Sequence, residues 1–192
     1  HTRASTVDEQ TAIASARQGD HRAYAWLIGR YKHMVFTVCS RVLRHREDAE
    51  EATQDVFVKA YQHIGGYQGG SRFSTWLYSI AYRTALSKLR TRKAGTLGLD
   101  ELQANGQEPQ QAPEGDRNDR KALVEWALAQ LPAEDAAVVT FFYLEELGIE
   151  EIVTITGLGE SNVKVKLHRA RKKLLTILQD HLKEETWTLH VD

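Results

Sequence analysis

Six basic side chains crowd a short segment near the end of the chain, and no acidic residue lies among them. They are Lys164, Lys166, Arg169, Arg171, Lys172 and Lys173. Lysine and arginine donate hydrogen bonds to DNA phosphates and to guanine edges, so the chemistry this segment can do is non-covalent recognition of DNA. An amphipathic stretch and a turn between Gly157 and Gly159 come just before it. That order is the sequence form of a helix-turn-helix, whose second helix enters the major groove.

The second helix of such a motif presents its N-terminal half to base edges. Three- and four-residue spacing places four residues near one face of that helix: Lys164, Val165, His168 and Arg169. The same spacing predicts a buried stripe made of Val163, Leu167, Ala170 and Leu174. The other cations, Lys166, Arg171, Lys172 and Lys173, are better placed for the DNA backbone. A basic helix that is merely solvated is the alternative.

A glycine-rich loop flanked by aromatic residues is the second candidate. Four glycines occupy positions 65, 66, 69 and 70, and Tyr67, Phe73, Trp76 and Tyr78 surround them. Five bases and no acid follow between residues 83 and 93: Arg83, Lys88, Arg90, Arg92 and Lys93. Aromatic faces and cations suit unpaired bases, which need stacking and a partner for the backbone. Composition alone favours a plain helix–helix loop beside a core tryptophan.

The third candidate for a functional surface is an acidic segment, residues 47 to 55. It contains Glu47, Asp48, Glu50, Glu51 and Asp55 with no base. This face is unsuited to DNA; it is either a solvated surface or a docking face for a basic protein. The net charge of the 192 residues is only −1. Because opposite charges are sorted into separate patches, the sequence indicates more than one kind of partner.

No catalytic or metal-binding pattern is visible. The eight histidines show no HExxH or other metal spacing, and neither a phosphate loop nor GxSxG occurs. The single cysteine, Cys39, lies on an apolar helical stripe, so we expect a core thiol. One cysteine fits a reducing compartment. No apolar run approaches ~20 residues and no signal peptide is visible, so we expect a cytoplasmic protein without membrane insertion, cofactor or metal.

The periodicity of the chain is helical throughout. Apolar residues recur at three- and four-residue steps in residues 21–43, 47–64 and 72–92, which predicts a four-helix domain over residues 8–93. Residues 94–116 hold five acids, four glycines and two prolines, and we predict a flexible acidic linker. A second helical domain is expected over 117–182, with Gly148 as a helix C-cap and the last helix ending near Leu182, before an uninformative tail, 183–192. The fold class is all-α: two small helical domains joined by a flexible linker.

Three segments, in this order, carry a resemblance to a known family. "DAEEATQDVFVKAYQHI" resembles its region two-point-two, and "FSTWLYSIAYRTALSKLR" its promoter-melting and minus-ten segment. "LPAEDAAVVTFFYLEELGIEEIVTITGLGESNVKVKLHRARKKL" resembles its region four. The family is the bacterial RNA polymerase sigma factors of the extracytoplasmic-function type, also called group four. The resemblance covers residues 8 to 182.

The resemblance implies three binding surfaces. The polymerase β′ clamp helices would contact Asp48, Glu51, Gln54, Asp55, Phe57 and Val58. The minus-ten element would be opened and one base captured by Lys59, His63, Tyr67, Trp76, Tyr78, Arg83, Lys88 and Arg90. The minus-thirty-five element would be read by Lys164, Val165, Lys166, His168, Arg169, Arg171 and Lys172. Arg83 stands where the family often has Asn and Val165 where it often has Ser, which affects the promoter sequence that is read.

The resemblance also implies partners: core RNA polymerase through its β′ clamp helices and β flap, promoter DNA, and an anti-sigma factor. A monomer is expected for the free chain. Three rivals remain open. A sigma-like decoy should lack the basic recognition face, and a helix-turn-helix repressor or activator needs neither the acidic helix nor the aromatic loop. An all-helical enzyme would need a convergent acid, base or metal set.

Overall fold

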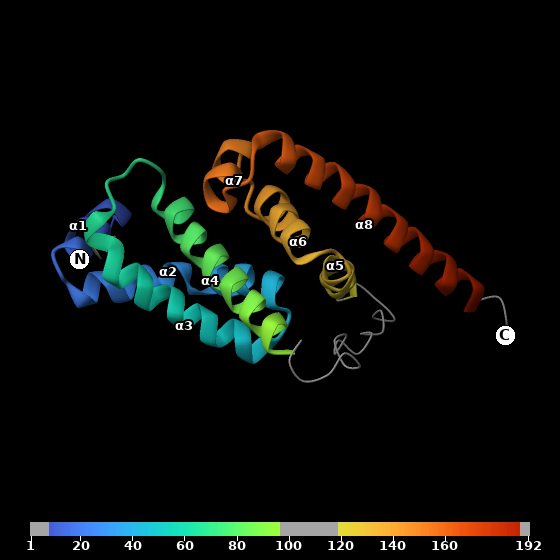
Figure 1. Ribbon diagram of the computed structural model, residues 1–192, viewed down its shortest axis with the longest axis horizontal. Helices are drawn as coiled ribbons and strands as arrows, with labels where there is room; N and C mark the ends of the chain where they lie inside the picture. The colour runs from blue at the N-terminus through green and yellow to red at the C-terminus, as the bar shows by residue number, and fades with distance from the viewer. Residues whose placement is uncertain (1–7, 97–118, 189–192) are drawn as a thin grey trace, which may run out of the picture.

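The computed structural model describes residues 8–96 and 119–188, and every regular element in these ranges is helical (Figure 1). The first range forms what we call the N-terminal bundle. It contains α1 (Glu9–Arg17), α2 (His21–Leu43), α3 (Arg46–His63), a 3-10 turn η1 (Ile64–Gly66) and α4 (Phe73–Thr96). The all-α prediction is therefore confirmed.

The long helix α2 forms the centre of the N-terminal bundle. It begins where the Asp20 carboxylate accepts hydrogen bonds from the backbone N–H groups of Arg22 (2.8 Å) and Ala23 (3.3 Å), which satisfies two otherwise unpaired donors. It ends at Arg44, whose φ of 57° leaves the helical region. Its buried stripe includes Cys39, and burial raises the pKa of that thiol to about 11. The predicted core role of Cys39 is confirmed.

The second range forms the C-terminal bundle. It contains α5 (Asp119–Ala129), α6 (Ala133–Val139), a π-helical turn η2 (Thr140–Leu144), α7 (Ile149–Thr156) and α8 (Glu160–Thr188). Gly148 was expected to end a helix, and that prediction is wrong. Its N–H donates to the Glu151 carboxylate at 3.1 Å, so Gly148 is the N-cap of α7. The C-cap is Gly157, whose φ of 72° lies in the left-handed region.

The two bundles share one continuous hydrophobic core. Helix α4 packs on α7 and α2 packs on α6, while α8 packs on α5, α6 and α7 (Figure 1). Phe141, fully buried in the C-terminal bundle, stacks on Tyr78 of α4 at a ring-centroid distance of 6.3 Å and meets Tyr82 edge-on at 6.2 Å. The sequence did not indicate this packing, because it depends on contacts between distant segments.

The helices extend past two predicted boundaries. Helix α4 runs to Thr96, three residues into the expected linker, and α8 runs to Thr188, beyond the expected end at Leu182. The rest of the predicted linker, 97–116, lies outside the described residues. No helix in residues 8–96 or 119–188 is long and apolar enough to cross a membrane.

Candidate nucleic-acid and protein interfaces

Helices α7 and α8 form the helix-turn-helix that the sequence predicted. Val163, Leu167 and Ala170 are buried against α6 and α7, which confirms three members of the predicted stripe, and the fourth, Leu174, is half-buried against the same core. The opposite side of α8 faces solvent. Its exposed side chains include six of the predicted DNA-binding residues: Lys164, Val165, His168, Arg169, Arg171 and Lys172. Because the stripe fixes the rotation of α8, these side chains are available to a major groove.

Lys166 differs from the other cations of α8. Its ammonium group lies 3.2 Å from the Asp135 carboxylate and 3.3 Å from that of Glu134, both in the first turn of α6. Burial alone would lower the pKa of Lys166, but hydrogen bonds to Asp135 and Glu134 outweigh it and raise the pKa. Lys166 was predicted to contact the DNA backbone. In this structure it instead fastens α8 to α6.

The glycine-rich segment before α4 is held by aromatic packing. The Tyr67 hydroxyl donates to the Ser71 carbonyl at 2.6 Å, and the Tyr67 ring lies 5.3 Å from Trp76 and 5.5 Å from Phe73. Phe73 is buried, whereas Tyr67 and Trp76 are half-buried. Both half-buried rings therefore keep part of their surface open beside the loop.

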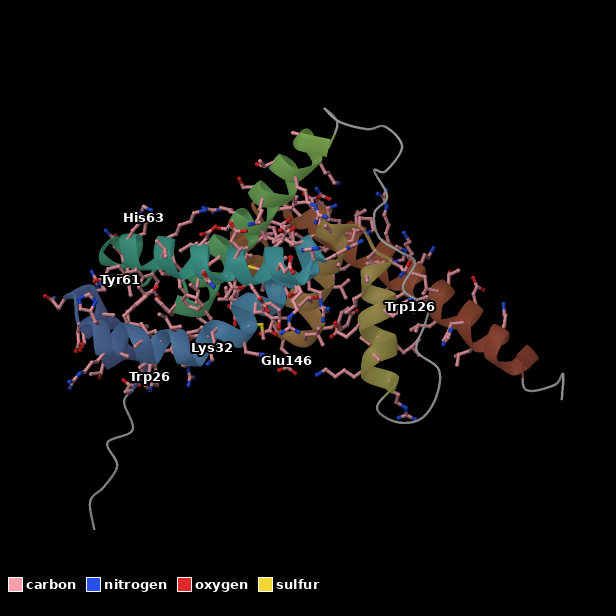
Figure 2. The ribbon with its side chains drawn as sticks, turned by 90° about the horizontal axis from the view of Figure 1, so that it is seen from below. Trp26, Lys32, Tyr61, His63, Trp126 and Glu146 are labelled. Carbon is pink, nitrogen blue, oxygen red and sulfur yellow. The ribbon has the colours of Figure 1, made fainter. Side chains whose placement is uncertain are left out.

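A basic side chain of α3 reaches the middle of α4, the helix that carries Trp76. The Lys59 ammonium donates to the Thr84 hydroxyl at 3.2 Å, which places Lys59 beside the middle of α4. Arg83 follows Trp76 by seven residues, two helical turns, and so shares its face. Four of the predicted minus-ten residues are exposed cations or histidine: Lys59, His63, Arg83 and Arg90. Figure 2 shows His63 near the end of α3, at the opposite end of the molecule from Trp126 on α5.

Tyr78 does not join this surface. It is 5% exposed, and its ring stacks on Phe141 of the C-terminal bundle. Burial raises the pKa of its hydroxyl well above the ordinary value. In this arrangement of the two bundles the Tyr78 ring is not open to DNA, and its predicted contact with DNA stays a prediction. Helical spacing groups Tyr78 with Thr75 and Tyr82, on a different side of α4 from Trp76 and Arg83.

The acidic segment forms an exposed stripe along α3. Glu51, Gln54, Asp55 and Val58 follow the i, i+3, i+4, i+7 spacing of one helical face, and all four are exposed. Val58, at 56%, is an exposed apolar side chain at the end of the stripe. Two acids of the segment are paired with α4: Asp48 with Arg92 at 3.0 Å, and Glu51 with Lys88. Lys88, predicted to bind DNA, therefore interacts with a predicted polymerase contact.

Phe57 is not part of that stripe. It is 8% exposed, and its backbone carbonyl accepts a hydrogen bond from the Tyr24 hydroxyl. The Phe57 ring belongs to the core of the N-terminal bundle, so its predicted contact with a protein partner stays a prediction that the exposed stripe does not include.

Sequence reasoning missed two arginines near the end of α2. Arg41 binds Glu125 of α5 with two guanidinium nitrogens, one of them at 2.7 Å, and its Nε donates to the Thr140 hydroxyl at 3.2 Å. Arg44 donates to the Leu131 carbonyl, and burial lowers the pKa of its guanidinium. Both residues join the two bundles. The sequence carries no local signal for such pairs, whose members are more than 80 residues apart.

Comparison with known proteins assigns both bundles. The family model described as "Sigma-70 region 2" matches residues 27–95, and that described as "Sigma-70, region 4" matches residues 122–174, so that together they cover more than half of the chain. The chain is 29% identical over 180 residues to the ECF RNA polymerase sigma factor SigW of Bacillus subtilis, covering 88% of this chain and 95% of that protein. It is 28% identical over 188 residues to the RNA polymerase sigma-H factor of Pseudomonas aeruginosa, covering 92% and 96%. The chain belongs to the extracytoplasmic-function sigma factors.

Solved structures agree with this sigma factor in fold. CnrH in complex with the cytosolic domain of CnrY has a TM-score of 0.65 at 20% identity, covering 90% of this chain and 97% of CnrH. The sigma factor RpoE of Bartonella quintana, in complex with the anti-sigma factor NepR, has the same TM-score and identity, covering 81% and 96%. The N-terminal bundle of this sigma factor is thus its region 2 and the C-terminal bundle its region 4, and the protein is a transcription initiation factor of RNA polymerase.

Proposed function

We propose that this sigma factor divides its work among three surfaces: the exposed side of α8, the exposed basic face of α3–α4, and the acidic stripe of α3. The observation that carries the proposal is the separation of opposite charges onto different surfaces. DNA repels the acidic stripe and attracts both basic surfaces. A protein partner for the stripe and a DNA partner for the basic surfaces follow from that difference.

The exposed side of α8 is proposed to read the minus-thirty-five element. We propose that Val165, His168 and Arg169 contact base edges, where an apolar side chain suits the thymine methyl group and arginine suits guanine. Lys164, Arg171 and Lys172 are proposed to contact phosphates, which set the register of the protein on the duplex. The Lys164 ion pair with Glu160 is no obstacle, because both side chains are exposed and such pairs contribute little.

The basic face of α3–α4 is proposed to bind the minus-ten element as a single strand. Unpairing a base costs a few kcal/mol, and stacking on an aromatic ring returns about 1–3 kcal/mol per base. Tyr67 and Trp76 offer partly open rings for stacking, while Lys59, Arg83 and Arg90 provide cations for the backbone. The protein thus acts through binding free energy, with no catalytic step.

The acidic stripe is proposed to bind the β′ clamp helices of core RNA polymerase. Carboxylates of Glu51 and Asp55 offer attraction to a basic partner, and Val58 offers an apolar contact at the end of the same face. The C-terminal bundle is proposed to contact the β flap. Control by an anti-sigma factor is proposed as well, because the similarly folded RpoE of Bartonella quintana was solved in complex with the anti-sigma factor NepR.

The substitution Asp55→Arg tests the polymerase surface. Asp55 is exposed and makes no described contact that holds the bundle together, so the variant should keep its helicity and melting temperature. We expect it to lose core polymerase in a pull-down assay while retaining binding to duplex DNA. Asp180→Arg is the matched control, because it makes the same change at an exposed position of α8 outside the stripe. Equal retention of polymerase by both variants would show that the stripe is not the docking surface.

A further inference from the structure

We infer that Glu9 of α1 and Tyr31 of α2 are positioning residues for the two rings on which single-stranded DNA is proposed to stack. These two rings, Tyr67 and Trp76, are called the stacking rings below. The inference rests on the proposed function of that surface and adds two residues that support it without contacting DNA. The match to region 2 begins at residue 27, so α1 lies before the matched residues.

The loop before α4 is not packed at its glycines. A Cβ added at any of its four glycines would meet no atom within 4 Å, so the loop backbone is open at these points. Glycine also loses more conformational freedom on ordering than any other residue. If the stacking rings moved freely with this loop, DNA binding would have to order them, and that cost would lower the affinity. The rings therefore need support from outside the loop.

Phe73 provides that support from the core side. Its ring is buried and lies 5.5 Å from Tyr67 and 5.4 Å from Trp76, while the stacking rings lie 5.3 Å from each other. Aromatic pairs at such distances are favourable. Tyr31 packs against Phe73 with a ring-centroid distance of 5.6 Å. The position of the Tyr31 ring therefore acts on the stacking rings through Phe73.

A carboxylate of α1 fixes Tyr31. The Tyr31 hydroxyl donates to one Glu9 oxygen at 2.8 Å, and the Arg30 Nε lies 3.2 Å from the other oxygen. Burial, and after it the bond to Glu9, raise the pKa of Tyr31 to about 12, so the hydroxyl keeps its proton and stays a donor. The Arg30 side chain is more than half exposed, and such ion pairs contribute little, whereas a hydrogen bond to a carboxylate is among the strong ones. The Tyr31 bond is therefore the main tie.

Helix α1 presents Glu9 at a fixed place. Ala12, Ile13 and Ala16 are buried and pack α1 onto α2. Glu9 precedes Ile13 by four residues and so shares its side of the helix. Helix α1 also contacts η1, the turn that leads into the glycine-rich loop, and both lie at the same end of the N-terminal bundle (Figure 1). After burial, the charge of Glu9 contributes to a raised pKa of the Tyr67 hydroxyl, which places this carboxylate near the loop.

Tyr24 offers a matched control for Tyr31. The two tyrosines lie seven residues apart on the buried stripe of α2, both are buried, and each hydroxyl donates a hydrogen bond. The Tyr24 hydroxyl donates to the Phe57 carbonyl of α3, however, and its ring meets Tyr61. Tyr24→Phe and Tyr31→Phe therefore remove the same group from the same helix, but only Tyr31→Phe should disturb the stacking rings.

Fluorine NMR tests the positioning without any DNA. The full chain is labelled with 5-fluorotryptophan, and the Trp76 signal is the one that Trp76→Phe removes. We expect Tyr31→Phe and Glu9→Ala to move or broaden that signal, because Phe73 transmits the loss, and Tyr24→Phe to leave it in place. Glu9→Gln should also leave it in place, since an amide oxygen still accepts a hydrogen bond from a hydroxyl. A Trp76 signal that responds equally to both tyrosine variants, or to neither, would overturn the inference.

DNA binding tests the consequence for function. The full chain, bound to core RNA polymerase, is titrated with a labelled minus-ten single strand and a minus-thirty-five duplex, both taken from a start obtained with the wild type. Tyr31→Phe should lower the affinity for the single strand about fivefold, which is ~1 kcal/mol at ~1.4 kcal/mol per tenfold, and leave the affinity for the duplex unchanged. The double variant Glu9→Ala/Tyr31→Phe should bind as Tyr31→Phe does, because both changes remove the same bond.

The outcomes separate the inference from the proposed function. Equal single-strand affinities for Tyr31→Phe and Tyr24→Phe would overturn the positioning role. A wild type that binds no single strand would instead count against the proposed minus-ten surface itself, and the fluorine signal of Trp76 would still decide whether Glu9 and Tyr31 hold the stacking rings.

Discussion

The salt dependence of DNA binding should distinguish Lys166 from the other cations of α8. Arg171 is exposed and is proposed to contact a phosphate, whereas the Lys166 ammonium is occupied by the carboxylates of Asp135 and Glu134. A cation that contacts a phosphate releases a counterion on binding, and one that is paired within the protein does not. We therefore expect Arg171→Ala and Lys166→Ala to behave differently, although both remove one positive charge from the same helix.

The expected size follows from the exposed cations. Three exposed cations of α8 are proposed to contact phosphates: Lys164, Arg171 and Lys172. The slope of log affinity against log salt is then about −2.7, at ~0.9 per contact. Affinity falls about 40-fold between ~50 and ~200 mM salt. Arg171→Ala should make the slope shallower by about 0.9, and Lys166→Ala should leave it unchanged.

Fluorescence anisotropy with a labelled duplex, titrated at several salt concentrations, measures these slopes. Thermal unfolding provides the second readout. Lys166→Ala should destabilise the protein by about 1 kcal/mol through loss of its charged hydrogen bonds to α6, while Arg171→Ala should leave stability unchanged. Equal changes in slope for the two variants would refute the assignment of Lys166 to helix packing, and a flat slope for the wild type would remove the case for α8 as a DNA-binding helix.

Three further predictions concern the stability of the fold and the contact between the two bundles. Gly157→Ala should lower the free energy of unfolding by about 1 kcal/mol, because the φ of 72° at this position is strained for any residue with a Cβ. A steric clash adds nothing, since an added Cβ meets no atom within 4 Å. Calorimetry measures the loss, and an unchanged melting temperature would contradict the prediction. Asp20→Ala should cost about 1 kcal/mol by removing the N-cap of α2, and Asp20→Ser should restore most of it. Arg41 holds the folded-state pKa of Glu125 below its ordinary value, so the stabilisation that this pair gives to the contact between the two bundles is complete above the ordinary glutamate pKa and is lost as pH falls through the lowered one. The radius of gyration of Glu125→Gln should therefore exceed that of the wild type at neutral pH and match it in acid; a difference that persists in acid would contradict this cause.

Local patterns of the sequence predicted the parts of the fold that local interactions decide. Val163, Leu167 and Ala170 were predicted to be buried from their spacing, and they are, because a helix that packs on one side needs only a three- and four-residue repeat. The exposed side of α8 then follows from the same rotation. Gly148 was misassigned because a glycine between two helices serves equally well as the end of one or the start of the next, and the Glu151 bond decides.

Contacts between distant segments determine the features of the fold that the sequence did not predict. Spacing placed Tyr78 on a face of α4, but it could not indicate that Phe141 of another bundle covers that face. Phe57 lies next to exposed Val58, and only the packing of α2 against α3 determines which of them is buried. Lys166 belongs to a basic run in the sequence, yet Asp135, which binds it, is 31 residues away. Resemblance to a family transfers a residue's role, whereas the burial of that residue depends on the conformation the chain adopts.

Transcription in vitro tests the central claim most directly. Core RNA polymerase is combined with this chain and fragmented source DNA, and the 5′ ends of the RNA are sequenced, with Asp55→Arg as the paired control. With the wild-type protein, the account predicts discrete new RNA starts that share two upstream sequence motifs. With Asp55→Arg, it predicts that these starts are lost. Absence of new starts with the wild type, with core polymerase bound or not, would contradict it.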